Sequence, residues 1–572
     1  MKRIVIFFAI AMVCAAIGRA AYQSALSHEP PPLSRYVPAG AVLYLEAPDF
    51  SSLLSGWNSS AGKKQWVATS NYEVFSRSRL FLRLKGASDQ YTAAAGLPPN
   101  MDFLSQVAGT RSALALYDIG NLEFLYVTYL PSAKSMQTTL WQTRAKFEPR
   151  SAGGVRFYVR RDPQSQKEVA FAVSGDYLLL ATREDLLADA LQLRAGGQNR
   201  EKYRTVESEP WWSQAVASAG PAGDIRMVMN LEKIVPSPYF RTYWVQQNVT
   251  DMKQYSAAVS DLFRSSKQYR EERVLLRKTP PPPIAVEGLE AAADLVRLVP
   301  ESAGIYETKA YPSADSCFDL IETKVLATHL GPAPPSEIAP PMQLTSGETG
   351  TSSDLETRID QSAVVRPVTP QSASALKDLL DKNQILASLQ VQSTERDESG
   401  VFIRIHSAIV LAAASDWNQA DVEMALADFI RPGLTASEHG IAWQPKSGYS
   451  TLDGLWPLVT AVRGKYLLIA DDPASIEAML GNFNHNADLK TAVFVAGFNH
   501  QREQASFARF SGVVDRPNMA QSNNRGMDRQ PQFFSENMAS LSTTLAAISA
   551  EKIIVHVERD RVLQTVTYEW SR

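Results

Sequence analysis

The chain has little cysteine: only Cys14 and Cys317 occur among its 572 residues. Cys14 lies in an apolar N-terminal segment, so Cys317 has no second cysteine in the remainder with which to form an intramolecular disulfide. Stability must therefore come from packing, which a chain of this length supplies without covalent cross-links. The shortage of cysteine does not identify the cellular compartment.

An excess of charge of one sign is also missing, since 57 basic residues face 60 acidic ones and the formal net charge is -3. Nucleic-acid-binding domains usually carry a basic face, so we expect no nucleic-acid partner. The same balance argues against strong attraction to an anionic membrane surface. The hydrophobic content of 45% is ordinary for globular proteins, and the length predicts two or more domains.

Motifs of common enzyme classes are absent: there is no G-x-S-x-G elbow, H-E-x-x-H helix or EF-hand loop. The stretch from Gly56 to Lys64 is not a phosphate-binding loop, because five residues separate Gly56 from Gly62 and Lys64 replaces the magnesium-binding hydroxyl residue. The seven histidines are scattered, with none paired at metal-ligand spacing on a predicted helix. We therefore predict no catalytic, cofactor-binding or metal-binding residues.

Cys317 and several clustered aromatic residues are better explained by packing than by a catalytic or binding site. Cys317 lies in a helical pattern beside Phe318, so it is predicted to be a small core residue and not a nucleophile. Aromatic pairs could stack on glycans or peptides, but helical spacing favours ordinary packing. These aromatics are Trp211, Trp212, Tyr239, Phe240, Tyr243 and Trp244.

Long apolar runs are missing except at the N-terminus, where Lys2 and Arg3 precede an uncharged stretch over 4–18. A short basic start followed by such a run is typical of a secretory signal. An uncleaved membrane anchor is the equal alternative, although the run is shorter than the ~20 residues of a normal span. Residues 1–32 are predicted to be a signal peptide or anchor with a proline-rich tether. Either way, we expect the remainder outside the cytoplasm, in the periplasm or cell envelope.

The chain does contain an internal repeat. The pattern V-P-x-x-A-x-x-Y begins at Val37 and again at Val299. The pattern G-x-Y-L-L begins at Gly175 and again at Gly464. The two motifs are 138 residues apart in the first copy (175 − 37) and 165 apart in the second (464 − 299). Their common order predicts two related halves, with extra residues in the second.

The predicted domain limits follow from this repeat. We predict a first half over 33–278, a linker over 279–288 containing four consecutive prolines, and a second half over 289–572. The extra residues are assigned to a flexible insertion over 331–354, which is rich in Pro, Ser, Thr and Gly. Strands and helices alternate without a strict βαβ rhythm. The predicted fold is therefore α+β, with each half a mainly antiparallel sheet packed with helices, plus the N-terminal apolar helix.

Local patterns predict individual elements. Asp49, Ser313 and Asp472 are expected to cap helices, and Thr182 with Asp185 resembles a capping box. Strands are expected over 41–46, 112–117, 122–129, 304–308 and 401–412, with a C-terminal hairpin formed by 553–557 and 562–570. Helices are expected over 132–146 and 417–430, and apolar stripes predict two more, over 252–263 and 538–548. The charged segment 267–278 is predicted to be a solvated helix end.

Several of these segments resemble a known family. The stretch 37–44, the stretch 115–120 and both G-x-Y-L-L segments are similar to a family of bacterial exported proteins classified only as a domain of unknown function. The resemblance covers most of the chain after residue 33. It implies an envelope location and a repeated α+β build, and it brings no known catalytic residues.

Three functions are compatible with these observations. The leading hypothesis is a non-enzymatic envelope protein that binds another macromolecule or supports an assembly, with membrane contact through the N-terminal segment if that segment is uncleaved. The second is a binding protein for a small ligand or peptide in a groove between the halves. The third is a hydrolase whose site is assembled from distant residues, revealed by an acid or histidine of strongly shifted pKa.

Overall fold

The computed structural model describes residues 31–60, 63–64, 67–68, 72, 75–77, 79–196, 203–237, 252–326, 374–394, 405–434, 442–452, 457–503 and 548–570. Contacts divide the chain into two compact units. The first unit comprises Met1–Ser60 and Arg77–Val259, and the second comprises Ala61–Ser76 and Ser260–Arg572. Both are built from antiparallel sheet and helices, so the fold class is α+β, as the sequence predicts.

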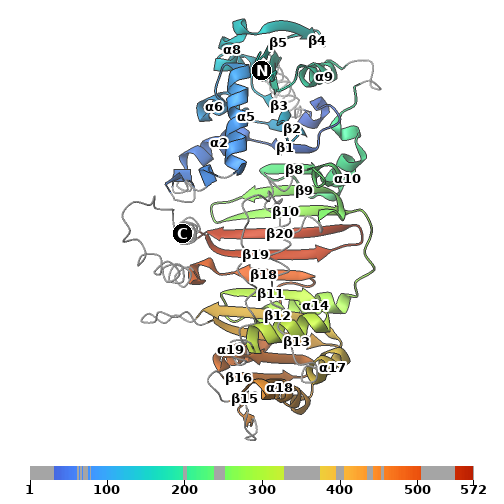
Figure 1. Ribbon diagram of the computed structural model, residues 1–572. Coiled ribbons are helices and arrows are strands. Elements are labelled where there is room, and N and C mark those ends of the chain that lie inside the picture. The colour runs from blue at the N-terminus through green and yellow to red at the C-terminus, as the bar shows by residue number, and fades with distance from the viewer. Residues whose placement is uncertain are drawn as a thin grey trace, which may run out of the picture. The chain divides into compact units, whose positions relative to one another are not determined.

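The first unit contains one antiparallel sheet, visible in Figure 1. Its hydrogen-bonded order is β8-β1-β2-β3-β7-β6-β5-β4. The strands are β1 (Leu43–Ala47), β2 (Ser112–Asp118), β3 (Glu123–Tyr129), β4 (Glu148–Ala152), β5 (Val155–Arg161), β6 (Glu168–Ser174), β7 (Tyr177–Ala181) and β8 (Ile225–Asn230). Every residue of β7 is buried, so helices must cover this part of the sheet on both faces.

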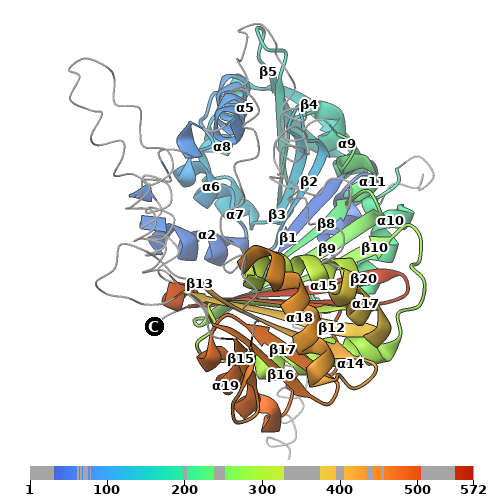
Figure 2. The ribbon, with the colours of Figure 1, turned by 60° about the horizontal axis from the view of Figure 1, so that its bottom comes forward.

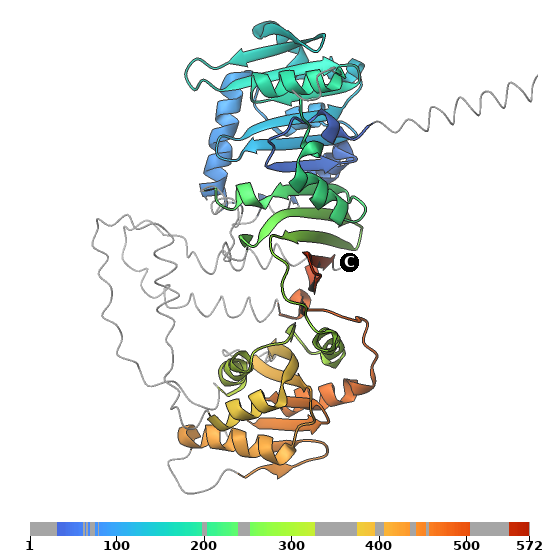
Figure 3. The same cartoon turned by 90° about the vertical axis from the view of Figure 1, so that its right-hand side faces the viewer.

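Helices α5 and α9 lie on opposite sides of this sheet, as Figure 2 shows. In Figure 3 α5 runs along one side of the unit. Together with α6 it covers a cluster of buried side chains that includes Phe103, Phe171 and Leu178. The helices of the unit are α2 (Phe50–Ser59), α5 (Arg79–Ala95), α6 (Met101–Val107), α7 (Ser132–Ser135), α8 (Thr139–Gln142), α9 (Glu184–Arg194), α10 (Pro210–Ser218) and α11 (Leu231–Ile234), with 3-10 turns η1 (Leu33–Tyr36), η2 (Arg144–Lys146) and η3 (Val206–Ser208).

The sheet of the second unit is ordered β9-β10-β20-β19-β18-β11-β12-β13-β17-β16-β15-β14. The division between the units falls inside β9. The strands are β9 (Tyr255–Arg264), β10 (Gln268–Arg277), β11 (Ile305–Ala310), β12 (Ile385–Thr394), β13 (Ile405–Ala413), β14 (Gln444–Pro445), β15 (Ser450–Leu452), β16 (Leu458–Arg463), β17 (Tyr466–Ala470), β18 (Phe494–Phe498), β19 (Ile548–Val557) and β20 (Arg561–Trp570).

Alternation along the central strands of the second unit separates two apolar cores. Ile409 and Leu411 of β13 belong to one core, whereas Ala408 and Val410 belong to the other, because successive side chains of a strand point to opposite faces. The helices that cover these faces and flank the sheet are α14 (Val286–Leu295), α15 (Ala314–Leu320), the π-helical η5 (Ile321–Val325), α17 (Ser374–Asn383), α18 (Gln419–Leu434) and α19 (Pro473–Gly481), with 3-10 turns η4 (Val296–Leu298) and η7 (Asn482–Asn484).

Several local predictions are confirmed. Gly175 and Gly464 have positive φ angles of 53° and 57° and turn the chain into β7 and β17, a conformation that favours glycine. Asp472 caps α19 by accepting hydrogen bonds from the amides of Ala474 and Ser475, with proline at the first helical position. Asp49 and Ser313 also cap helices, and β19 and β20 form the predicted C-terminal hairpin.

The predicted helix over 252–263 is wrong, because residues 255–264 form β9. The run from Ala257 to Asp261 is buried without interruption, so the alternation that would have marked a strand is absent. The charged segment after it is also a strand, β10, and not a helix end. Between them, the Ser265 amide donates to the Gln268 carbonyl at 2.9 Å, which closes a tight turn.

Two further local predictions fail in the first unit. Residues 132–146 form α7, α8 and a 3-10 turn instead of one helix. Thr182 does not cap α9: its hydroxyl accepts a hydrogen bond from the Phe124 amide at 2.8 Å, and Arg183 takes the cap position without a side-chain bond. Thr182 therefore fastens the end of β7 to β3.

Some predictions lie outside the described residues. They concern the apolar N-terminal segment, the aromatics from Tyr239 to Trp244, the insertion over 331–354, and nearly all of the stripe over 538–548. Within the described part of the chain, no helix is long and apolar enough to cross a membrane. The limits predicted for the halves were drawn from repeated sequence, whereas the two units are defined by contacts, so those limits stay predictions.

Candidate ligand-binding site

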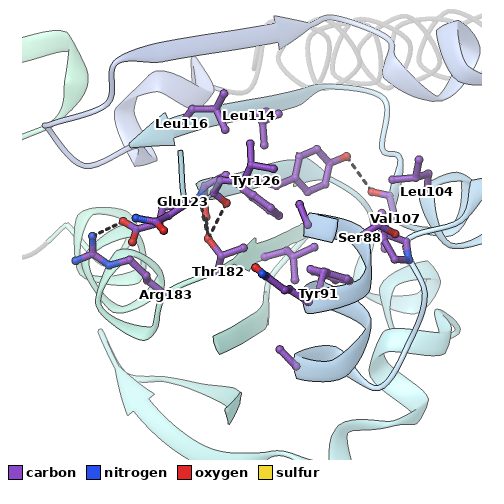
Figure 4. A pocket seen from close by; sticks show the side chains of 18 of the residues that line it. Ser88, Tyr91, Leu104, Val107, Leu114, Leu116, Glu123, Tyr126, Thr182 and Arg183 are labelled. Atoms are coloured by element: carbon purple, nitrogen blue, oxygen red, sulfur yellow. Dashed lines mark hydrogen bonds and ion pairs between the residues drawn. The ribbon is translucent and has the colours of Figure 1, made fainter. Parts of the chain in front are cut away.

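The first unit contains a pocket of about 1070 Å³ between helices α5 and α6 and one face of the sheet. Figure 4 shows Ser88 and Tyr91 of α5 facing side chains of the strands. Strands β1, β2, β3 and β7 supply the wall opposite the helices, and the starts of α2 and β8 add one residue each. The pocket lies within the first unit and does not depend on the second.

Most of the pocket wall is apolar. Successive strands present leucine and aromatic side chains to it, because every second residue of a strand points to the same face. Leu114 and Leu116 of β2 illustrate this spacing, as do Phe124 and Tyr126 of β3. The other apolar residues of the wall are Leu45, Ala47, Phe50, Leu84, Ala87, Ala94, Pro99, Phe103, Leu104, Val107, Ala113, Leu122, Leu180 and Ile225.

Charged residues gather where the strand turns meet the pocket. Arg183, just after β7, donates to Glu123 Oε2 at 2.9 Å and to Asp185 Oδ1 at 3.0 Å. These hydrogen bonds raise the pKa of Arg183 above its usual value, and the bond to Asp185 has the larger effect. Arg183 is thus a permanent cation already held by two carboxylates.

The other carboxylates of the pocket also have cationic partners. Glu46 accepts from Arg111 Nε at 2.8 Å, and Glu168 pairs with Arg161. Lys167 donates to the Asn121 amide oxygen at 3.5 Å. Glu123 and Asp185 share one guanidinium, but with Lys167 counted the four carboxylates of the pocket face four cations. The charges at this end of the pocket therefore balance in total, and it carries no strong net field for an ionic ligand.

Two tyrosines of the pocket differ in their hydroxyl environments. The Tyr126 hydroxyl donates to the Val107 carbonyl at 3.0 Å and lies 3.1 Å from Ser112 Oγ. The Tyr91 hydroxyl is buried and has no hydrogen-bond partner among the described residues. Its ring meets Phe103 edge-on, with centroids 6.0 Å apart. Burial raises the pKa of Tyr91, so this hydroxyl stays protonated at neutral pH.

Cys317 lies elsewhere, in the core of the second unit. Its side chain is 1% exposed, and burial raises the pKa of its thiol to about 12. A thiol needs a lowered pKa to act as a nucleophile. The prediction that Cys317 is a core residue is therefore confirmed.

Histidine and carboxylate approach each other at two places in the second unit. His406 Nδ1 lies 3.4 Å from Asp471 Oδ1, and His500 Nε2 lies 3.6 Å from Glu551 Oε2. Asp471 Oδ1 accepts from the Ser407 amide at 2.9 Å, which ties it to the sheet. Desolvation lowers the pKa of His500. No group of three or more His, Cys, Asp or Glu suited to a metal occurs among the residues that the structure describes.

Of the aromatics considered in the sequence, Trp212 packs in the interior. Its ring meets Tyr44 edge-on at 4.6 Å between centroids, and its side chain is buried. Trp211 donates its indole N–H to Glu209 at 2.7 Å. Sequence reasoning did not find Tyr91 or the other pocket residues, because they come from segments as far apart as Leu45 and Ile225.

Comparisons with known proteins give no family. No protein-family model matches the sequence, and no curated protein matches it. Among solved structures, crystal form I of TP0453 aligns at 11% identity and a TM-score of 0.24, covering 45% of this chain and 82% of that one. Crystal form III of TP0453 aligns at 12% identity and a TM-score of 0.24, covering 45% and 84%. The resemblance to an exported family stays a prediction.

Proposed function

We propose that the protein is a non-enzymatic binding protein whose first unit holds a mainly apolar and uncharged small molecule between α5, α6 and the sheet. The observation that carries this proposal is the pocket of about 1070 Å³ with its largely apolar wall. Its volume lies just above the roughly 300–1,000 Å³ typical of small-molecule sites. The pocket is partly open to solvent, so an apolar ligand that fills it would remove apolar surface of the wall from water.

The charge distribution supports an uncharged ligand. An ionic ligand near Arg183 would have to compete with Glu123 and Asp185, both already bonded to the guanidinium. Desolvating an ion without a new partner is costly, whereas an apolar chain gains free energy by leaving water. Among the three functions compatible with the sequence, the pocket thus favours small-ligand binding, with a site inside one unit instead of a groove between halves.

The hydrolase alternative receives less support. Cys317 is buried and protonated at neutral pH. His406 and His500 each approach one carboxylate, but neither lines the pocket. The wall of the pocket therefore offers contacts for binding in place of a nucleophile activated by a base.

We also propose that the two halves are copies of one structural unit. Strands β8-β1-β2-β3-β7-β6-β5-β4 and β18-β11-β12-β13-β17-β16-β15-β14 follow the same chain order in their sheets. The repeated motifs occupy matching places, with Val37 and Val299 before β1 and β11, and Gly175 and Gly464 before β7 and β17. The basic start and apolar run at the N-terminus support a location outside the cytoplasm.

Fluorescence titration with N-phenylnaphthylamine, a neutral apolar dye that brightens in apolar surroundings, tests the binding function. Ser88 lines the pocket, so Ser88→Trp fills part of it. The matched control is Asp89→Trp on the next residue of α5, which is exposed and outside the pocket wall. We expect saturable dye binding in the wild type, at least ~10-fold weaker in Ser88→Trp and unchanged in Asp89→Trp.

Circular dichroism checks that both variants keep the fold. No saturable binding to the wild type, or equal weakening in the two variants, would contradict the proposed function. Dye binding that Ser88→Trp leaves unchanged would place the apolar site elsewhere on the protein.

A further inference from the structure

One end of the pocket is formed by turns at an edge of the sheet. Its polar residues come from the turn between β2 and β3, the turn between β5 and β6, and the segment after β7, within 121–123, 165–168 and 182–185. Lys167 donates to Asn121 at 3.5 Å, which joins the first two turns. In Figure 4 Arg183 lies at this end, away from Val107 of α6. We call this polar end the mouth, because Asn121 and Gln166 are exposed there.

The two turns of the mouth have the same build. Asp118 and Asp162 begin them, and each carboxylate accepts a hydrogen bond from the amide three residues later, at 3.0 and 2.8 Å. Four residues after each aspartate the backbone φ is positive, 51° at Leu122 and 57° at Gln166. A positive φ crowds the Cβ of every residue except glycine, so a side chain at such a position is kept against a conformational cost.

Glycine provides the positive φ angles in the turns at the opposite edge of the same sheet. Gly153 and Gly154, between β4 and β5, have φ angles of 56° and 74°, and Gly175, between β6 and β7, has a φ of 53°. These turns lie at the other edge because each strand of the series β3-β7-β6-β5-β4 is antiparallel to the next. Among the described residues, four besides glycine have a positive φ, and two of them, Leu122 and Gln166, line the mouth. Side chains are therefore retained at the mouth where glycine would fit the backbone better.

Leu122 is the less expected of these two residues. Gln166 donates from its amide to the Pro163 carbonyl at 2.8 Å, so its side chain stabilises its own turn. The side chain of Leu122 is apolar and makes no hydrogen bond, and it does not belong to the buried cluster that contains Phe103. Leu122 is half-buried and lines the pocket. Backbone strain of this kind gathers at ligand-contacting positions, where binding gives the strained residue its use.

We infer that Leu122 contacts the bound ligand, and that this ligand is an amphiphile whose apolar part fills the pocket and whose uncharged polar head lies at the mouth. The inference rests on the proposed function and narrows its ligand class. At the mouth a polar head keeps water and the side chains of the turns as hydrogen-bond partners, so it avoids the cost of burial. The charges there balance in total, which favours an uncharged head over an ionic one.

Binding and stability then make opposite demands on residue 122. Asparagine adopts a positive φ more readily than leucine, so Leu122→Asn relieves the strain of the free protein. The same change removes apolar surface that the ligand covers, so it weakens binding. A leucine kept only for packing would instead lose stability on this substitution.

The test uses the full chain and octyl β-glucoside, a nonionic amphiphile, which competes with N-phenylnaphthylamine below its micelle concentration. We expect Leu122→Asn to raise the inhibition constant of octyl β-glucoside about 3- to 10-fold. The midpoint of thermal unfolding without ligand should equal that of wild type or exceed it. Gln384→Asn is the matched control, because Gln384 has a positive φ of 48°, is exposed and is not part of the pocket wall. This control should lower neither the midpoint nor the affinity for octyl β-glucoside.

Octyl β-maltoside tests the place of the head. Its second sugar lengthens the head on the same chain, so a head at the open mouth predicts an inhibition constant within about 3-fold of that of octyl β-glucoside. A larger difference would mean an enclosed head and overturns the inference. An unchanged inhibition constant of octyl β-glucoside in Leu122→Asn overturns it too, as does a lower thermal midpoint of this variant.

The two proposals fail in different ways. If the dye does not bind wild type, the proposed function falls, and the ligand class falls with it. If the dye binds and Ser88→Trp weakens its binding, but octyl β-glucoside does not displace it or binds Leu122→Asn as tightly as wild type, only the present inference falls.

Discussion

Glu272 of β10 lies opposite Thr565 of β20, and each is the fifth residue of a ten-residue strand. The register is therefore symmetric about this pair: Gln268 faces Glu569, and Leu276 faces Arg561. The preceding strands β9 and β19 are also ten residues each and begin 293 residues apart (548 − 255), as do β10 and β20 (561 − 268). Equal lengths and a symmetric register are what two copies of one hairpin would give.

The first prediction concerns Glu271, the residue next to Glu272 on β10. Its carboxylate accepts from Arg273 at 2.6 and 2.7 Å and from Ser260 at 2.6 Å. Burial opposes ionisation, but the hydrogen bonds from Arg273 and Ser260 outweigh it and lower the pKa of Glu271. We expect Glu271→Gln to lower the free energy of unfolding by about 1–2 kcal/mol at neutral pH.

The pH dependence of this effect has a definite sign. A carboxyl whose pKa is lower in the folded state stabilises the fold above its unfolded pKa, and the benefit is lost as pH falls through the folded value. The difference between wild type and Glu271→Gln should therefore shrink below about pH 4.5. Glu272→Gln is the control, since its 3.3 Å pair with Arg270 is more exposed and worth little. Urea unfolding across pH measures both, and an equal loss in the two variants would contradict the prediction.

The second prediction compares the two pocket tyrosines in the free protein. Tyr91→Phe removes a buried hydroxyl without a described partner, so the free energy of unfolding should rise by roughly 1 kcal/mol. Tyr126→Phe removes a hydroxyl bonded to Val107 and Ser112, so the free energy of unfolding should fall by roughly 1 kcal/mol. Thermal unfolding without added ligand gives the comparison. Destabilisation by Tyr91→Phe as large as that by Tyr126→Phe would mean that its hydroxyl is already satisfied.

The third prediction concerns Gly109, between α6 and β2. A Cβ there would stand 2.1 Å from the Tyr129 carbonyl oxygen and 2.2 Å from Thr128 Oγ1, far inside van der Waals contact. Because β3 cannot move away without breaking its ladder, Gly109→Ala should destabilise the protein by at least ~2 kcal/mol. The same change should weaken dye binding, since Thr128 and Tyr126 share one hydroxyl cluster with Ser112.

Gly56→Ala is its control, because a Cβ at that helical position meets nothing within 4 Å. Alanine is a better helix former than glycine by up to ~1 kcal/mol, so this variant should equal or exceed wild type in stability. The shift in urea midpoint measures the destabilisation. Comparable destabilisation by the two substitutions would show that the atoms of Thr128 and Tyr129 around Gly109 move aside for a Cβ, and would contradict the prediction.

Local chemistry explains which elements the sequence could predict. Gly175 and Gly464 mark turns because a positive φ strains other residues, and Asp472 marks a helix start because its carboxylate satisfies free amides. Thr182 has the same local signature, but its hydroxyl bonds to Phe124, which lies 58 residues away in sequence. A tertiary contact therefore determines the hydrogen-bond partner of Thr182, and the residues around Thr182 in the sequence do not indicate that contact.

The pocket was beyond sequence reasoning for the same reason. Tyr91 lies on α5 and Tyr126 on β3, and only the folded first unit brings both to the same pocket, on opposite walls. Nothing around Tyr91 in the sequence tells whether its hydroxyl has a partner, since that depends on what α6 and the sheet present to it. Likewise β9, buried continuously from Ala257 to Asp261, has no alternation to distinguish it from a helix.

The fourth prediction concerns Cys317 and tests the enzyme alternative directly. Its side chain is 1% exposed, and burial raises the pKa of the thiol to about 12. At about pH 8 the thiolate fraction would then be on the order of 10⁻⁴, and the thiolate is the reactive form. With Cys14→Ser as background, native protein should react with iodoacetamide only at the rate of unfolding. Denatured protein should react fully, as measured by intact mass. Rapid alkylation of native Cys317 would show an accessible, activated thiol and would restore a nucleophile to the second unit.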